Sequence, residues 1–334
     1  MDWDEVRAGR LARTHLAERA PGERLVEVVR DLCGVHAQVM GSAELQLAAR
    51  IDGIVQADVR SALWERRELA KTWTTRGTLH VHPADELSLW TSARRALAED
   101  GRADVVAAIG DALRGRRLTR EELADAVLER VPSAPREELA SGWGFHLSDA
   151  ALAGLLCFGP PAGAKVTIVH VDDWLGPQQR WEREAALREV VRRYATTFAP
   201  VGARQLRSWF GTRADVDVPT VAHGPAAGGS VRLLPEYDPY VMGFREREQL
   251  VPPAVQERIR AHGKGRYEGA AGTPLLVVDG LAAGIWRRRR AAGRIELAVE
   301  PARRLTPAER AGVEAEAERI GSFLGLEPIL RLAS

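Results

Sequence analysis

Lysine and cysteine are scarce in this chain of 334 residues. Its two cysteines, Cys33 and Cys157, are too few for a disulfide framework or a four-cysteine zinc site. Lysine occurs only at Lys71, Lys165 and Lys264, so nearly all of the 47 basic residues are arginine. Arginine makes planar, bidentate contacts to phosphate and guanine that lysine cannot make. A GC-rich genome also favours arginine codons, so the excess alone assigns no function.

Long apolar runs are absent too. No run reaches the roughly 18 residues of a membrane-spanning helix, and residues 1–5 are acidic, without the apolar stretch of a signal peptide. We therefore expect a cytoplasmic protein with no membrane partner. The 47 basic and 46 acidic residues give a net charge of +1, which argues against a strongly basic nucleic-acid binder. Apolar residues make up 45% of the chain, enough for the cores of two or three domains.

The common catalytic motifs are missing as well. The chain has no Walker P-loop, no G-x-G-x-x-G, no H-E-x-x-H and no G-x-S-x-G. Gly263-Lys264-Gly265 lacks the flanking strand and helix of a phosphate loop. His80 and His82 would share one face of a strand, but local hydrogen bonding or helix capping explains them better than a metal does. Cys33 with His36 lacks a third ligand, so we expect no metal and no other cofactor.

Short helices followed by strands recur three times along the first 230 residues. Apolar residues spaced by three and four predict the helices, and Thr119-Arg120-Glu121-Glu122 is a capping box. Residues 71–82 and 165–171 predict strands, and a third round ends in Val216, Val218 and Val221. This order is that of a winged helix. We predict an α+β fold with three tandem winged-helix modules, at residues 1–98, 99–180 and 181–230.

Residues 231–334 predict a different domain. Asp279-Gly280 separates two apolar runs, which is a strong signal for a β-hairpin, and residues 295–299 predict a further strand. Thr306-Pro307-Ala308-Glu309 is a capping box with proline at the first helical position, so a final helix begins there. We predict a small β-barrel or sheet closed by this C-terminal helix.

The segment His36-Ala37-Gln38 lies between two predicted helices, the second of which we expect Ser42 to cap. In extended backbone its first and third side chains face one side, whereas Val35, Ala37 and Val39 face the other and anchor the segment. Such a loop can present polar groups to a cleft, but the same two side chains can also satisfy backbone groups within a turn. The residues alone leave both interpretations open.

Several segments, in this order, resemble one family, the bacterial winged-helix DNA glycosylases typified by AlkZ and YcaQ. They are residues 32–39, 74–80, 233–240 and 278–280 with Gly284-Ile285-Trp286. The resemblance covers nearly the whole chain, and the ordered set is more specific than any single motif. It implies three winged-helix motifs in a concave arrangement, followed by a C-terminal β-barrel.

The family's catalytic signature is Gln-x-Gln, or Gln-x-Asp in the YcaQ branch, and here it reads His36-Ala37-Gln38. The resemblance therefore implies a His-x-Gln variant of the AlkZ-like branch, with His36 and Gln38 as catalytic residues. The implied reaction is hydrolysis of the N-glycosidic bond of an alkylated purine, N7-alkylguanine or N3-alkyladenine, in double-stranded DNA. The variant is associated with self-resistance to DNA-alkylating natural products, which suggests bulky adducts. No lysine adjoins the motif, so we expect a monofunctional enzyme without a Schiff base.

The resemblance also implies a monomer associated with the nucleoid. The alternative is a non-catalytic winged-helix transcriptional regulator, but a regulator usually needs only one or two modules and a dimer interface.

Two further segments are candidates for DNA contacts. Arg287-Arg288-Arg289-Arg290 precedes a predicted turn near Ala292-Gly293 and should contact the DNA backbone, although a solvated charged turn has the same composition. On the first predicted hairpin, alternate residues Arg76, Thr78 and His80 share one face, and we expect that face to border the active cleft. The competing interpretation pairs Arg76 with an acidic residue of a neighbouring helix.

Overall fold

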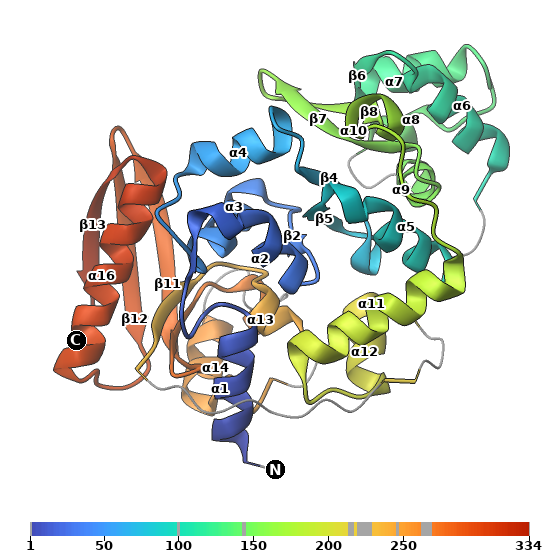
Figure 1. Cartoon of the computed structure of the whole chain (residues 1–334). Helices are drawn as coiled ribbons and strands as arrows, with labels where there is room; N and C mark the ends of the chain where they lie inside the picture. Colours follow the sequence, from blue (N-terminus) through green and yellow to red (C-terminus); the bar gives the residue numbers. More distant parts are fainter. Residues whose placement is uncertain are drawn as a thin grey trace. The chain divides into compact units, whose positions relative to one another are not determined.

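The computed structural model describes residues 2–98, 101–141, 145–212, 217–218, 229–244, 247–261 and 269–333. Val216 and Val221, on which a third strand is predicted, and Gly263-Lys264-Gly265 lie outside the described residues. The chain forms two compact units, each discontinuous in sequence (Figure 1). Unit 1 combines Met1–Val59, Arg193–Trp209 and Val216–Ser334, and unit 2 combines Arg60–Arg192 with Phe210–Asp215.

Unit 1 contains short helices and one large sheet. Its helices are α1 Trp3–Arg13, α2 Leu25–Asp31, α3 Met40–Ala48, α12 Ala203–Phe210 at the unit's border, α13 Pro239–Met242, α14 Pro253–Ala261 and α16 Pro307–Leu324. Two short strands, β1 Ala20–Pro21 and β3 Ile51–Asp52, pair in parallel, and β2 is Val35–His36. The helices α4 Gln56–Trp64 and α11 Arg183–Phe198 run from one unit into the other.

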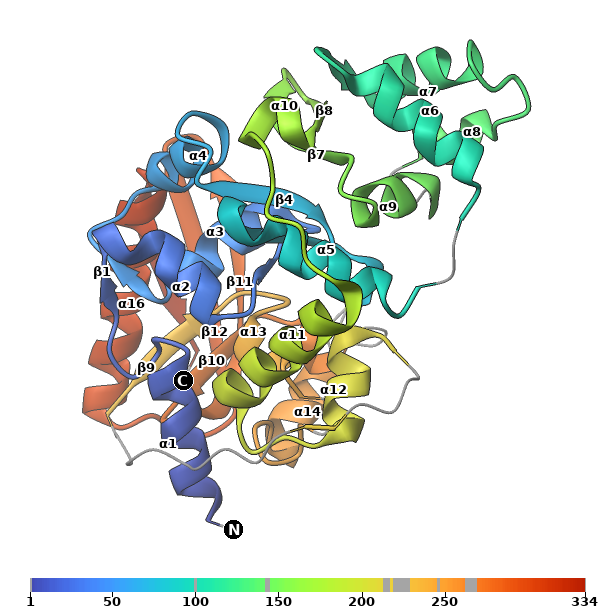
Figure 2. The ribbon, with the colours of Figure 1, turned by 45° about the vertical axis from the view of Figure 1, so that its right-hand side comes forward.

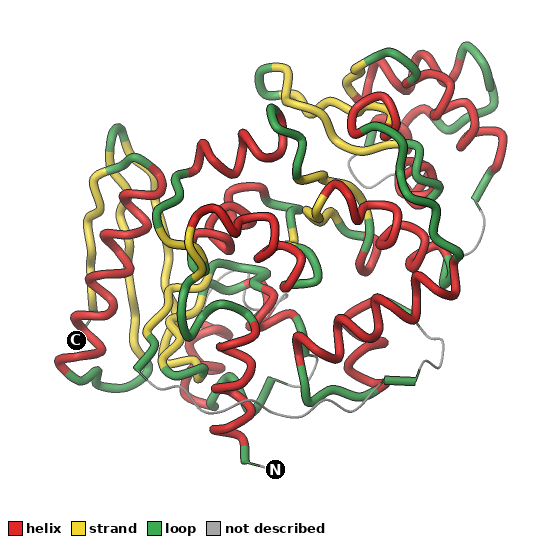
Figure 3. The backbone as a smooth tube through the Cα atoms, in the orientation of Figure 1, coloured by secondary structure: helices red, strands yellow, loops and turns green. Residues whose placement is uncertain are grey.

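The large sheet of unit 1 has five strands, drawn yellow in Figure 3. They are β9 Val231–Leu234, β10 Leu275–Val278, β11 Leu281–Ala291, β12 Arg294–Pro301 and β13 Glu327–Leu332. Their order is β13-β12-β11-β10-β9, and only β12 and β13 pair in parallel. Because β9 and β13 are its two edges, the sheet is open: the predicted C-terminal β-structure is a curled half-barrel and not a complete barrel.

Local chemistry explains the boundaries of this sheet and its helix. Asp279 and Gly280 have φ values of +48° and +78°, the backbone of the type I′ turn that an Asp-Gly pair predicts. The capping box of Thr306 and Glu309 starts α16 as predicted, and Gly325 ends the helix in the left-handed conformation. The helix α16 contacts β9, β12 and β13 (Figure 1 and Figure 2).

Unit 2 has two small antiparallel β-structures surrounded by helices. The strands β4 Leu69–Trp73 and β5 Leu79–Pro83 form the first predicted hairpin, and β6 Arg117–Thr119, β7 Leu156–Ala162 and β8 Lys165–His170 form a sheet of order β6-β8-β7. Its helices are α5 Leu87–Arg95, α6 Ala103–Leu113, α7 Arg120–Leu128, α8 Arg136–Ala140, α9 Phe145–Leu152 and α10 Val171–Leu175. The predicted capping box at Thr119 and Glu122 is present.

Within the described residues, no helix is both long and apolar enough to cross a membrane.

Candidate active site

The predicted catalytic segment begins on the short strand β2, not in an open loop. Cys33 and Gly34 have φ values of +58° and +90°, which end α2 and turn the chain into β2. His36 is 7% exposed, whereas Gln38 is half-buried. The pair therefore combines an imidazole shielded from solvent with an amide that solvent can reach.

The residues between and around this pair only partly follow the prediction. Val35 and Ala37 are fully buried and anchor the segment, as their alternation predicts. Val39 is 43% exposed, so its predicted anchoring role is wrong. The helix α3 begins at Met40 with Val39 at its N-cap, so Ser42 lies inside the helix and does not cap it.

The ring of His36 packs against a tyrosine that follows it by 201 positions. The ring centroids of His36 and Tyr237 are 4.7 Å apart, with an interplanar angle of 36°. Tyr237 has a φ of +60°, a conformation that costs a residue with a side chain roughly 1–2 kcal/mol. Its N–H donates to the carbonyl of Ala271 at 2.6 Å, which helps to hold the turn. A strained residue that touches a candidate catalytic side chain is typical of a functional site.

Two polar side chains of α3 bind this tyrosine turn to β2. The hydroxyl of Ser42 donates to the carbonyl oxygen of Glu236 at 2.5 Å. The Nε2 of Gln46 lies 3.2 Å from the carbonyl oxygen of His36 and 3.5 Å from that of Glu236. Because carbonyl oxygens only accept hydrogen bonds, these contacts fix which end of the Gln46 amide faces them. One buried amide thus bridges the backbone at His36 and the turn before Tyr237.

A buried ion pair fixes the other side of the same turn. Asp238 and Arg50 are both fully buried, with N–O distances of 2.6 and 2.7 Å. Asp238 also accepts from the N–H of Tyr240 and caps α13. Removing one partner of such a pair leaves an uncompensated buried charge and costs about 3–5 kcal/mol. The ion pair therefore anchors the turn whose Tyr237 contacts His36.

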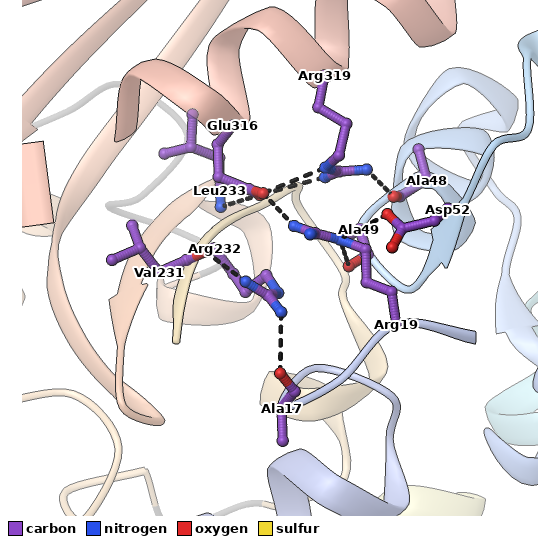
Figure 4. Close-up of polar contacts among 10 residues, drawn as sticks. All are labelled: Ala17, Arg19, Ala48, Ala49, Asp52, Val231, Arg232, Leu233, Glu316 and Arg319. Atoms are coloured by element: carbon purple, nitrogen blue, oxygen red, sulfur yellow. Dashed lines mark hydrogen bonds and ion pairs between the residues drawn. The ribbon is translucent and has the colours of Figure 1, made fainter. Parts of the chain in front are cut away.

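The far end of α3 is held by a cluster of charged side chains (Figure 4). Arg319 donates to the carbonyl of Ala48, and Arg19 donates to that of Ala49 at 3.2 Å. Both arginines also bind Glu316 of α16, which accepts from the N–H of Leu233 in β9 at 3.1 Å. These contacts satisfy carbonyls that a helix leaves unbonded at its C-terminus. The cluster therefore ties α3 to α16 and to the large sheet.

The charges of this cluster persist at neutral pH. Burial by itself would raise the pKa of Glu316, but Arg319 and Arg19 outweigh it and hold that pKa below its ordinary value of 4.5. Burial, followed by the neighbouring Arg19, lowers the pKa of Arg232 to about 10. Arg232 donates to the carbonyls of Val231 and Ala17, at 2.8 and 3.2 Å.

The basic run 287–290 lies on β11, just before the two-residue turn at Ala292 and Gly293, as predicted. Arg287 and Arg289 are 61% and 79% exposed and pair with Glu300 and Glu296 of β12. Arg288 is only 23% exposed, and its two terminal nitrogens bind the Glu236 carboxylate at 2.9 and 2.8 Å. Arg290 is exposed and makes no ion pair with any described residue. The run is therefore not one uniform basic patch.

The second group of predicted DNA contacts lies in unit 2. Arg76 is not on a strand, because Thr75–Gly77 form a 3-10 turn in which Arg76 has a φ of +59°. Thr78 is half-buried, and His80 is 4% exposed on β5, with its ring 6.0 Å from that of His82. The predicted alternation on one strand face therefore fails at Arg76, because the turn interrupts the extended backbone.

Cysteine and metal chemistry find no support in the described part of the chain. Both cysteines are buried and neither forms a disulfide, and burial raises the pKa of the Cys157 thiol to about 12. Among the described residues, no three His, Cys, Asp or Glu side chains gather into a metal-binding group.

Residue-level reasoning on the sequence missed three residues that surround His36. Glu236 and Tyr237 belong to a segment that the family resemblance singled out, but no role followed from it. Gln46 carries no motif at all. It lies ten residues after His36, and only the fold shows that its side chain on α3 reaches the His36 carbonyl on β2.

The chain is similar to known proteins along most of its length. A family model described as "DNA glycosylase AlkZ-like" matches residues 29–222 and 214–323. An interstrand DNA cross-link repair glycosylase of Streptomyces sahachiroi is 30% identical over 339 residues, covering 85% of this chain and 87% of the relative. The solved structure of the Streptomyces sahachiroi DNA glycosylase AlkZ superposes with a TM-score of 0.75 at 26% identity and full coverage of both chains.

These matches do not favour the alternative of a non-catalytic regulator, because the relatives are named as glycosylases. The chain is a DNA glycosylase, a hydrolase of N-glycosyl bonds, and it belongs to the AlkZ-like family.

Proposed function

We propose that this glycosylase removes N7-alkylguanine and N3-alkyladenine from double-stranded DNA, including bulky natural-product adducts. The observation that supports the proposal is that His36 is buried against the ring of Tyr237, while Gln38, two residues along the same segment, is half-buried. The related enzyme of Streptomyces sahachiroi is named for interstrand cross-link repair, so cross-linked purines belong to the same proposed substrate class. A role in self-resistance to a DNA-alkylating toxin follows from that class.

His36 and Gln38 act on a water molecule in the proposed reaction. An alkylated purine of either kind is cationic, so it leaves readily and needs no strong acid. As the bond between C1′ and the base nitrogen breaks, the base takes the bonding pair and becomes neutral. The water attacks C1′, its proton passes to the neutral imidazole of His36, and an abasic site remains. The Gln38 carbonyl accepts from the water and orients it without changing charge.

The DNA contacts and modules of the enzyme are also part of the proposal. Arg287, Arg289 and Arg290 contact the DNA backbone, and Arg76, Thr78 and His80 border the lesion site. Residues 1–98, 99–180 and 181–230 form winged-helix modules in a concave arrangement, residues 231–334 form the C-terminal sheet closed by α16, and the enzyme acts as a monomer. The order α6-β6-α7-α8-α9-β7-β8, helices followed by a β-hairpin, supports this for the second module, since it resembles that of a winged helix.

Base release from defined lesions tests the substrate class. The enzyme is incubated with duplexes that carry N7-methylguanine, a bulky N7 adduct or an interstrand cross-link, and the released base is identified by mass spectrometry. Alkali then reveals abasic sites as strand breaks. We expect release from the bulky adduct and no release from an undamaged duplex. Activity on none of the three lesions would contradict the proposal, and trapping of the protein on DNA by borohydride would contradict a monofunctional mechanism.

A further inference from the structure

We infer that Arg288 is a positioning residue for His36, which acts through the Glu236–Tyr237 turn and not through the DNA backbone. The inference rests on the proposed role of His36 in base excision. It separates Arg288 from the three neighbouring arginines that the sequence groups with it.

A continuous path of contacts joins the two residues. Arg288 binds the Glu236 carboxylate through two hydrogen bonds of 2.8 and 2.9 Å. The backbone carbonyl of Glu236 accepts hydrogen bonds from the Ser42 hydroxyl and the Gln46 amide. The same amide also donates to the His36 carbonyl. The next residue, Tyr237, packs its ring on the imidazole at 4.7 Å. Every one of these residues belongs to unit 1.

The strand register explains why Arg287 and Arg289 do not share this role, whereas Arg290 lies on the same face as Arg288 but is exposed. On β11, Arg287 and Arg289 lie on the face that carries Glu296 and Glu300 of β12 and pair with them there. Arg288 projects from the opposite face, where its cross-strand neighbour is the buried Leu297. It is correspondingly less exposed, at 23% compared with 61% and 79% for its two neighbours.

The ion pair between Arg288 and Glu236 is suited to hold the turn that carries Tyr237 in place. Two parallel hydrogen bonds between a guanidinium and a carboxylate fix both distance and orientation. The turn needs such support because Tyr237 has an unfavourable positive φ. Without Arg288, the Glu236 carboxylate, which is 18% exposed, loses its counter-charge. The turn can then relax, and the ring that packs on His36 moves with it.

The competing role is a contact to a DNA phosphate, and the two roles affect different measurements. Removal of a phosphate contact weakens DNA binding and lowers the salt slope by roughly 0.9, while the excision rate at saturating enzyme stays the same. Removal of a positioning contact leaves binding unchanged and slows the chemical step, since a misplacement of about 1 Å can cost about 100-fold in rate.

The test compares Arg288→Ala with Arg303→Ala. Arg303 makes an equally bidentate pair with Glu309 in the same unit, at 2.8 and 2.7 Å, and neither residue belongs to the path of contacts described above. Single-turnover excision of an N7-alkylguanine duplex is measured at saturating enzyme, together with the Kd and its salt dependence. We expect Arg288→Ala to slow excision about 10- to 100-fold with Kd and salt slope unchanged. Arg303→Ala should leave the excision rate, the Kd and the salt slope as in the wild type. A raised Kd with an unchanged saturating rate would overturn the inference.

Two additions keep the test decisive. Arg288→Lys keeps the charge but not the bidentate geometry, so it should restore only part of the rate and serves if Arg288→Ala folds poorly. Glu236→Gln combined with Arg288→Ala should be no slower than the slower single variant, because both disrupt the same pair. Additive losses would contradict a shared path.

A readout without excision separates this inference from the proposed function. The His36 imidazole signal is identified in the nuclear magnetic resonance spectrum by its loss in His36→Gln. We expect Arg288→Ala to shift that signal, whereas Arg303→Ala leaves it in place. An unshifted His36 signal in Arg288→Ala would overturn positioning even if the wild-type enzyme excises its base. A wild-type enzyme that releases no base would instead contradict the proposed function. The spectral comparison would then still decide whether Arg288 positions His36.

Discussion

The imidazole of His36 and the phenol ring of Tyr237 lie 4.7 Å apart, although 200 residues separate them in the chain. The contact joins the catalytic signature of the family to the turn at the end of β9. It also shields one side of an imidazole that is only 7% exposed.

Replacing Tyr237 tests whether this ring supports catalysis. Tyr237→Gly removes the ring but suits the positive φ, so the fold should keep its melting temperature while single-turnover excision falls about 10-fold or more. Tyr237→Phe keeps the ring and should retain most of the rate. Equal losses in both variants would assign the effect to the hydroxyl and not to ring packing.

Gln38 should contribute to the chemical step and not to folding. We expect Gln38→Ala to lower the single-turnover rate about 100-fold or more, the range for losing one preorganised polar group. DNA affinity and thermal stability should change little, because the side chain is half-buried at the end of a short segment. Excision at the wild-type rate by both Gln38→Ala and His36→Ala would remove this pair from the mechanism.

The pH dependence of excision should report the imidazole. A protonated His36 cannot accept the proton of water and would place positive charge beside a cationic sugar. The rate should therefore be full where His36 is neutral and fall in acid as the imidazole becomes protonated. His36→Gln restores the family signature and should retain activity with a flatter profile. An identical acid limb in that variant would assign the titration to another group.

The exposed arginines of β11 should govern salt-dependent binding. We expect the double change Arg289→Ala and Arg290→Ala to weaken binding of damaged and undamaged duplexes alike. The salt slope should fall by roughly 0.9 for each DNA phosphate that the variant no longer neutralises. The saturating excision rate should remain that of the wild type, in contrast to Arg288→Ala. An unchanged salt slope would exclude these two side chains from the DNA interface.

Glu316 should stabilise the fold most strongly at neutral pH. Glu316→Gln removes the buried charge that Arg19 and Arg319 share, so the free energy of unfolding should fall by about 3–5 kcal/mol. Because the folded-state pKa of Glu316 lies below its ordinary 4.5, its contribution is present above that value and is lost as pH falls through the folded pKa. Denaturation at pH 7 and pH 3 should therefore show a difference between variant and wild type that shrinks in acid. A constant difference would contradict this linkage.

Local signals in the sequence determined the helix starts and the tight turns. The capping boxes at Thr119 and Thr306 and the Asp279-Gly280 turn appear where they were predicted. Each depends on interactions within about four residues, so neighbouring side chains suffice to specify it. The ordered family segments likewise identified the enzyme class and the candidate pair His36 and Gln38.

Only the tertiary structure decided what surrounds that pair and how the basic run divides. Ser42 looks like a helix cap in the sequence, yet it binds the carbonyl of Glu236 from within α3. The sequence groups Arg288 with three similar arginines, but the strand register places it on the face opposite Arg287 and Arg289, where it binds Glu236. Contacts across some 50 to 200 residues depend on how distant elements pack, and no local pattern of charge or hydrophobicity encodes them. For that reason the sequence by itself could point to His36 and Gln38, whereas the residues that hold them in place emerged only from the fold.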